Sequence, residues 1–271
     1  LSLVGSEMCI RDRDRGFMSD MKIKSLIAET FLEVADALET GQYGKKPVIG
    51  FASEGSEHGE DNITRAMELA EAKGLKAVLI QGEDIHKQME VMLDSGEIDA
   101  AVTMHYPFPI GVSTVGKVIT PGIGKPMYIA TTTGTSDTDR VCGMVKNAIY
   151  GIIAAKADGV EHPTVGIANI DGARQTEKAL LKLKEQGYDI CFAESARADG
   201  GIVMRGNDLL MGTPDIMVMD SLTGNLMMKI FSAYTTGGNY ESLGFGYGPG
   251  IGDGYERLIM IVSRASGAPV I

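Results

Sequence analysis

The sequence is poor in basic residues and has no long apolar run. It contains 25 Lys and Arg against 36 Asp and Glu in 271 residues, which gives a formal net charge of -11 at pH 7. Proteins that bind the phosphate backbone need the opposite balance, so nucleic acid and anionic membrane surfaces are disfavoured as partners. No stretch reaches the roughly 18 uncharged apolar residues of a membrane-spanning helix. We therefore expect a soluble protein.

Several familiar site motifs are also missing. The three cysteines form no C-x-x-C pair, which argues against a disulfide scaffold or a thiolate zinc site and fits a reducing, cytoplasmic compartment. The four histidines are scattered and no H-E-x-x-H occurs, so no metal site is expected. Neither G-x-x-x-x-G-K-[ST] nor G-x-S-x-G is present, which disfavours P-loop nucleotide binding and serine hydrolases of the α/β type.

Both ends of the sequence are unusual. The opening LSLVGSEMCIRDR begins without methionine and resembles translated sequencing-adapter read-through. Residues 1–17 are therefore expected to be an artefact or a disordered tail, with Met18 or Met21 as the first native residue. The other end stops at Ile271 directly after a strand-like run, and we expect the chain to be a fragment that is truncated there.

Helical and strand-like patterns alternate along the rest of the chain. Apolar residues at helical spacing predict a helix within residues 22–40. Short apolar runs between turn residues predict buried strands at 47–52, 76–80, 99–104, 127–132, 164–170, 188–195, 215–220 and 258–263. Further helical patterns lie between them, at 62–73, 86–93, 139–157 and 174–186. Such alternation is typical of a mainly parallel sheet with helices on both faces.

A segment with glycine and proline at 157–163 indicates a domain boundary. We expect an α/β fold of two three-layer domains with mainly parallel sheets. The first domain would comprise residues 46–157 and 255–271, and the second residues 163–254. The ligand cleft would then lie between the domains, at the carboxyl ends of strands.

Hydroxyl-rich loops follow several of the predicted strands. In loop 53–59, Ser56 and His58 could hold an anion or serve in acid–base chemistry, or only cap and support the following helix. Loop 131–140 opens a helix whose dipole favours phosphoryl oxygens, and its candidate ligands are Thr132, Thr133, Thr135, Ser136, Thr138 and Arg140. The alternative for this loop is a helix cap formed by Ser136, Asp137 or Thr138.

Two later loops place charged side chains after strands. Strand 215–220 ends in Asp220 and is followed by the turn residues Ser221, Thr223, Gly224 and Asn225. After the last strand, Ser263 precedes Arg264, whose guanidinium could clamp a phosphate or form a structural ion pair. We expect Ser263, Arg264 and Asp220 to be catalytic and the turn residues to bind substrate. Local positive charge could come from Arg140, Arg174, Arg197, Arg205 and Arg264.

These motifs together resemble a known superfamily. TTGTSDTDR, PDIMVMDSLTGN and VSRASG are similar to the phosphate acetyltransferases and phosphate acyltransferases, which interconvert acyl thioesters and acyl phosphates on an isocitrate-dehydrogenase-like fold. Longer motifs resemble, more narrowly, the protein C alpha subunits of glycine, sarcosine and betaine reductase complexes. These motifs are HYPFPIGVSTVGKV, IANIDGARQTEKAL, FAESARADGG, VMRGNDLL and YTTGGNYESLGFGYGPGIG. The likeness runs from about Ile23 to Ile271.

The resemblance implies formation of acetyl phosphate from an enzyme-bound acetyl thioester and phosphate, in selenium-dependent amino-acid fermentation. It implies phosphate as co-substrate, no tightly bound cofactor, and a hetero-oligomer with the protein C beta subunit and selenoprotein A. In this resemblance, Ser263 and Arg264 match the superfamily's S-R pair. The segment with Thr135, Ser136 and Thr138 matches the part of the superfamily's site that binds phosphate, and Asn225 matches its G-N turn.

The thioester-forming cysteine of the family is expected beyond Ile271. Cys142 and Cys191 match none of its motifs, and we expect both to be buried structural residues.

Two other classes of function stay open. One is a nicotinamide oxidoreductase with the isocitrate-dehydrogenase-like fold, and the other is a noncatalytic assembly subunit that docks the beta subunit through the glycine-rich segment 237–254.

Overall fold

The computed structural model of the chain describes residues 24–28, 30–32, 34–35, 38, 44–198, 200–235 and 248–271. It consists of two units, residues 1–46 and residues 47–271. In the first unit the described residues from Lys24 to Leu38 are helical. The expected tail at residues 1–17 lies outside the described residues. All elements below belong to the second unit.

One sheet of eleven strands forms the centre of residues 47–271. Its strands are β1 (Val48–Ala52), β2 (Lys76–Ile80), β3 (Ala100–Thr103), β4 (Val112–Ile119), β5 (Pro126–Gly134), β6 (Thr164–Ala168), β7 (Cys191–Phe192), β8 (Val203–Met204), β9 (Ile216–Val218), β10 (Gly248–Gly252) and β11 (Ile259–Ile261). The strand order is β2-β1-β3-β11-β10-β4-β5-β9-β6-β7, and β8 pairs with β6. Pairing is antiparallel in β11–β10, β10–β4 and β4–β5 and parallel elsewhere. The expected α/β class with a mainly parallel sheet is confirmed.

Helices connect the strands and cover both faces of the sheet. They are α2 (Glu60–Ala72), α3 (Ile85–Asp94), α4 (Arg140–Ala157), α5 (Ala173–Glu185), α6 (Gly206–Met211) and α7 (Ser221–Thr235). Because successive side chains of a strand point to opposite faces, each strand feeds two cores. In β5, Ile129 packs in one core with Phe231 of α7, and Ala130 packs in another with Met144 of α4. The sheet is therefore the middle of three layers.

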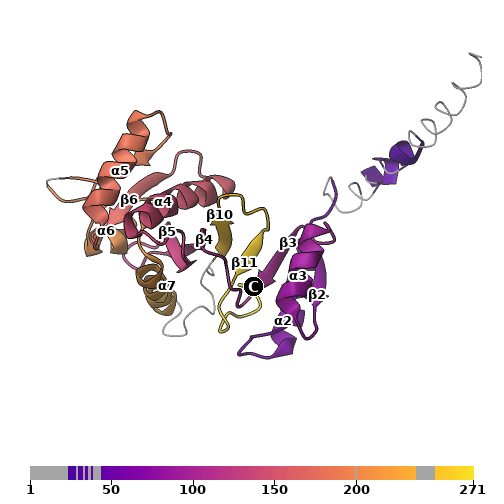
Figure 1. Ribbon diagram of the computed structural model, residues 1–271. Coiled ribbons are helices and arrows are strands. Elements are labelled where there is room, and N and C mark those ends of the chain that lie inside the picture. Colours follow the sequence, from indigo (N-terminus) through magenta and orange to yellow (C-terminus); the bar gives the residue numbers. More distant parts are fainter. Residues whose placement is uncertain are drawn as a thin grey trace, which may run out of the picture. The chain divides into compact units, whose positions relative to one another are not determined.

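The last two strands of the chain lie in the middle of the sheet. Figure 1 shows β10 and β11, in yellow, between the amino-terminal strand β3 and the strand β4. This placement pairs β11, from the end of the chain, in parallel with β3. Strands of both expected domains lie in the one sheet, and the division into two domains stays a prediction.

The sequence pattern does not predict β4 and β10, because neither has a strand's usual apolar alternation. In β4, Ser113 and Thr114 are fully buried, and their hydroxyls bond to those of Ser136 at 2.6 Å and Thr132 at 2.8 Å. Buried polar groups are tolerated when they are paired in this way. In β10, the sequence GPGIG is extended because it pairs with β4 on one side and β11 on the other.

The expectation that both cysteines are buried is wrong. Cys142 is exposed and Cys191 is partly exposed. Cys142 lies in the first turn of α4, where its N–H donates to Asp139, the residue that caps the helix. The pKa of the Cys142 thiol is raised by hydrogen bonding to the Asp139 carboxylate, so the thiol is protonated and a poor nucleophile. Cys191 lies in β7, at the edge of the sheet.

Candidate active site

A cavity of about 330 Å³ lies where the chain leaves three neighbouring parallel strands. The strands β1, β3 and β11 pair in parallel, so their carboxyl ends meet at the same edge. The loops that follow them contribute most of the wall, and β5 and α7 complete it. The lining residues are Glu57, Met104, His105, Tyr106, Thr133, Asn225, Lys229, Ile261, Ser263 and Arg264. Four of the predicted site residues, from three separate segments of the chain, therefore meet here, namely Thr133, Asn225, Ser263 and Arg264.

Arg264 and Lys229 supply positive charge to this cavity. The Arg264 side chain is exposed, and no carboxylate pairs with it in the part of the chain that the structure describes. Glu57 is the only acidic side chain among the described lining residues. Of the two alternatives for Arg264, these contacts favour the binding of an anion over a structural ion pair.

The loop after β1 holds the loop that carries Ser263 and Arg264. The Glu57 N–H donates to the Arg264 carbonyl at 2.8 Å, and His58 Nε2 lies 3.0 Å from the Ala265 carbonyl oxygen. Asn62 Nδ2 donates to Ser56 Oγ at 3.2 Å and to the Ser266 carbonyl at 3.0 Å. Ser56 and His58 therefore support the neighbouring loop, and neither lines the cavity. The N-cap of α2 is Gly59, not Ser56.

Asn225 is fixed on the other wall by the close approach of α7 to β5. Its Nδ2 donates to the Thr132 carbonyl at 3.0 Å. A Cβ on Gly224 would lie only 1.9 Å from the Thr131 carbonyl oxygen, so the helix reaches this position only with glycine there. Lys229 follows one turn after Asn225 on the same face of α7. The predicted residue Gly224 thus sets the geometry of the wall.

The predicted carboxylate Asp220 lies outside the cavity lining and caps α7. Its oxygens accept hydrogen bonds from the Thr223 N–H at 3.0 Å and the Thr223 hydroxyl at 2.8 Å. Arg140 pairs with the same carboxylate at 3.1 Å and donates to the Asp171 carbonyl at 2.8 Å. Burial raises the pKa of Asp220, but the Thr223 hydrogen bonds and the Arg140 charge outweigh it and hold the pKa below its usual value. Ser221 is the first residue of α7.

Asp220 should make stability depend on pH. Because its folded-state pKa is lowered, its contribution is present above the unfolded pKa of about 3.9 and is lost as the pH falls through the folded value. We expect Asp220→Asn to lower the unfolding free energy at pH 7. The difference in unfolding free energy between this variant and the unmodified protein should shrink as the pH falls below about 4. Urea unfolding at several pH values measures this. The control is Asp171→Asn, because Asp171 meets Arg140 only through its backbone carbonyl. A pH-independent effect of Asp220→Asn would contradict the prediction.

The threonine-rich loop is divided between the interior and the surface. The hydroxyls of Thr132 and Ser136 are buried and bond to Thr114 and to Ser113 and Asn147. Thr135 and Thr138 are exposed and do not line the cavity, which leaves Thr133 as the member of the loop that does. The helix cap is Asp139, not one of the three residues that the sequence suggested. The phosphate-binding roles of the remaining members stay predictions.

Sequence reasoning did not select Lys229, His105, Tyr106, Met104 and Glu57. For two of them, His105 and Lys229, the position in the sequence could have indicated a place in the site. His105 comes directly after a predicted strand, and Lys229 lies four residues after Asn225, the spacing of one helical turn. His105 is held by its backbone carbonyl, which accepts from His86 Nε2 at 2.9 Å and Thr103 Oγ1 at 3.0 Å. Arg205 lies in a different cavity.

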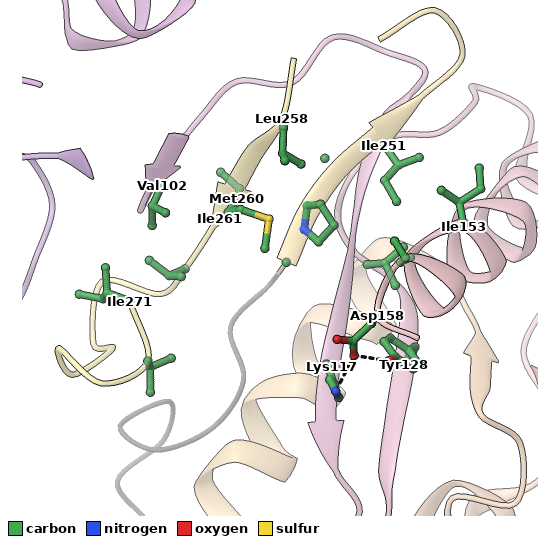
Figure 2. A pocket seen from close by; sticks show the side chains of 18 of the residues that line it. Val102, Lys117, Tyr128, Ile153, Asp158, Ile251, Leu258, Met260, Ile261 and Ile271 are labelled. Carbon is green, nitrogen blue, oxygen red and sulfur yellow. Dashed lines mark hydrogen bonds and ion pairs between the residues drawn. The ribbon is translucent and has the colours of Figure 1, made fainter. Parts of the chain in front are cut away.

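A larger cavity of about 700 Å³ does not suit a phosphate. Figure 2 shows its wall, which is formed mainly by apolar side chains such as Val102, Leu258 and Met260. Its charged groups are already paired, since Lys117 donates to Asp158 at 2.5 Å and the Tyr128 hydroxyl donates to the same carboxylate. Size alone therefore does not identify the site, and the smaller polar cavity is the candidate.

Over the described ranges, no three His, Cys, Asp or Glu side chains gather in a way that could hold a metal ion. In the same ranges, no helix is both long enough and apolar enough to cross a membrane.

The fold defines an α/β protein, and the candidate ligand site lies at the carboxyl ends of parallel strands. The profile of the family described as "Fatty acid synthesis protein" matches residues 36–267. The chain therefore belongs to this family. It is 60% identical over 269 residues to the glycine/sarcosine/betaine reductase complex component C subunit alpha of Peptoclostridium acidaminophilum, a match that covers 93% of this chain and 69% of that protein. The resemblance inferred from the motifs is confirmed.

More distant relatives are named phosphate acyltransferase. The protein of Acetivibrio thermocellus is 28% identical over 121 residues, which covers 43% of this chain and 33% of the relative. That of Thermotoga maritima is 28% identical over 155 residues, which covers 51% of this chain and 45% of the relative. The chain thus matches less than half the length of these acyltransferases.

Proposed function

We propose that this chain transfers acyl groups between a thioester and phosphate, in the cavity that Arg264, Lys229, Asn225 and Ser263 line. The observation that carries the proposal is the Arg264 guanidinium, which is exposed at a cavity between strand ends and has no ion pair with a described residue. The relatives named phosphate acyltransferase support the same chemistry.

The side chains that line the cavity suit the negative charges that meet during the reaction. A phosphate oxygen attacks the thioester carbonyl, the C–S bond breaks, and the sulfur leaves as a thiolate. Phosphate is already anionic at neutral pH, so the attack needs orientation and charge neutralisation more than a general base. In our proposal Arg264 and Lys229 hold the phosphate, and the hydroxyls of Ser263 and Thr133 donate to the carbonyl oxygen as it becomes an oxyanion. Asp220 orients α7 by capping it.

The physiological reaction that we propose is a specific case of this acyl transfer. We propose that the thioester is an acetyl thioester on the enzyme and that the product is acetyl phosphate. The chain would act in the cytoplasm within a reductase complex, with the protein C beta subunit and selenoprotein A as its partners. The relative named component C subunit alpha of the glycine/sarcosine/betaine reductase complex supports this assignment. The proposal needs phosphate as co-substrate and no tightly bound cofactor.

Arsenate provides the test, because acyl arsenates hydrolyse in water and make the transfer irreversible. With S-acetyl-N-acetylcysteamine as the thioester, the protein should release thiol in proportion to arsenate, and phosphate should compete. Thiol release that does not depend on arsenate, or no release from the folded protein, would contradict acyl transfer to an oxyanion of this type.

A further inference from the structure

A third cavity, of about 500 Å³, lies on the other side of the first half of α7 from the candidate active site. Thr223 and Met227 of α7 line it, whereas Asn225 and Lys229 line the candidate active site. Residues two apart in a helix point in nearly opposite directions, so the helix separates the two cavities. The third cavity lies at the carboxyl ends of the parallel strands β6, β8 and β9.

The wall of this third cavity is mostly apolar and rich in methionine. Its lining includes Met204, Met217 and Met219, each at most 1% exposed, and the partly exposed Ile170, Leu209 and Met227. These side chains belong to the core that β5 and α7 share, so the cavity opens directly onto that core. Methionine is unbranched and flexible, and it adapts to apolar ligands of different shape. The wall therefore suits a linear apolar chain.

The one charged side chain that lines this cavity among the described residues is Arg205. Its backbone is anchored, because the Arg205 N–H donates to Asp208 at 2.9 Å. The Asp208 carboxylate is 2% exposed and also accepts from Ser195, from the Ala196 N–H and from Thr213. The exposed Arg205 guanidinium has no ion pair with any residue that the structure describes, in contrast to Arg140, which pairs with Asp220. It is therefore available to a ligand.

We propose that this cavity binds an amphipathic carboxylate, with its apolar chain against Ile170, Leu209 and Met227 and its carboxylate on Arg205. A planar carboxylate fits the two parallel N–H donors of a guanidinium. A singly charged group also suits the site better than a doubly charged phosphate ester, because a negative charge lies close to the wall. The Asp220 carboxylate accepts a hydrogen bond from Thr223, which lines the cavity. The volume lies within the roughly 300–1,000 Å³ of small-molecule sites. This proposal does not depend on the proposed function.

Methionine methyl NMR separates this site from the other two cavities. In protein labelled with ¹³C at the methionine methyl groups, each cavity has its own reporter, namely Met217, Met219 and Met227 here, Met104 in the candidate active site and Met260 in the larger apolar cavity. Single Met→Leu variants assign the signals. Octanoate should shift the first three signals saturably and leave Met104 and Met260 unchanged.

The role of Arg205 is tested with a charged and a neutral ligand of the same chain. Arg205→Gln should weaken octanoate binding about tenfold and change 1-octanol binding less than about twofold, because only the carboxylate needs the charge. The matched control, Arg65→Gln, removes an exposed arginine of α2 and should change neither. Octanoate that shifts only Met260 or Met104, or binds Arg205→Gln as tightly as the unmodified protein, would overturn the proposal. Failure of acyl transfer would not affect these signals.

Discussion

Replacing Arg264 with glutamine is expected to lower kcat/KM for arsenate-dependent cleavage of S-acetyl-N-acetylcysteamine about 100-fold, because the variant loses the positive charge that holds and orients the attacking oxyanion. Glutamine keeps much of the side chain's length and hydrogen-bonding capacity but not its charge. The effect should fall mainly on the use of arsenate and phosphate, because the thioester itself is neutral.

The control for Arg264→Gln is Arg65→Gln. Arg65 carries the same charge, but its partner is Glu68 of the same helix at 3.0 Å, and it does not line the candidate site. Both variants change the net charge of the protein equally, so long-range electrostatic effects cancel in the comparison. Equal kcat/KM values for the two variants would show that Arg264 does not hold the phosphate.

Replacing Gly224 with alanine is expected to destabilise the protein by about 3 kcal/mol or more, as overpacking of a tight contact does. The added Cβ would lie 1.9 Å from the Thr131 carbonyl oxygen, so α7 must move away from β5. This movement would disturb Met228 and Phe231, which are at most 1% exposed. It would also displace Asn225, so activity should fall in any folded fraction. The urea midpoint measures the loss of stability.

Gly143→Ala is the matched control for Gly224→Ala. Gly143 is also a helical glycine, but the nearest atom to an added Cβ lies 3.6 Å away, an ordinary contact. Alanine in the interior of a helix is favoured over glycine by about 0.5–1 kcal/mol, so this variant should be as stable as the unmodified protein or more stable. If Gly224→Ala is as stable as Gly143→Ala, the close approach of α7 does not set the site's geometry.

The sequence predicts well which loops form the candidate site. It predicts less well which side chains of those loops point into the cavity. Ser263 and Arg264 could be identified because they follow a short apolar run that is typical of a buried strand. Thr132 and Ser136 were grouped with Thr133 because a hydroxyl-rich loop shows no sign of which hydroxyls β4 will bury. That strand was itself missed, since its buried Ser113 and Thr114 lower its apolar signal. Pairing between distant segments decides these positions.

The same limit applies to charged residues. Asp220 and Arg264 both follow strands, and the chain pattern does not distinguish a helix cap from a ligand group. In the fold, Asp220 has Thr223 and Arg140 as partners, whereas Arg264 pairs with none of the described acidic residues. Partners so far apart in the sequence, such as Arg140 and Asp220, become neighbours only through the sheet order. Periodicity therefore predicts the α/β class, and three-dimensional contacts separate the structural residues from the candidate site.

The most direct test of the proposed site is a phosphate titration of protein labelled at the methionine methyl groups. If phosphate binds between Arg264 and Lys229, the Met104 signal should shift saturably, and the shift should disappear in Arg264→Gln but persist in Arg65→Gln. Met104 is suitable because it lines this cavity and lies beside the Arg264 loop. Saturable shifts at Met217, Met219 or Met260 with Met104 unchanged would place the phosphate elsewhere and contradict the account.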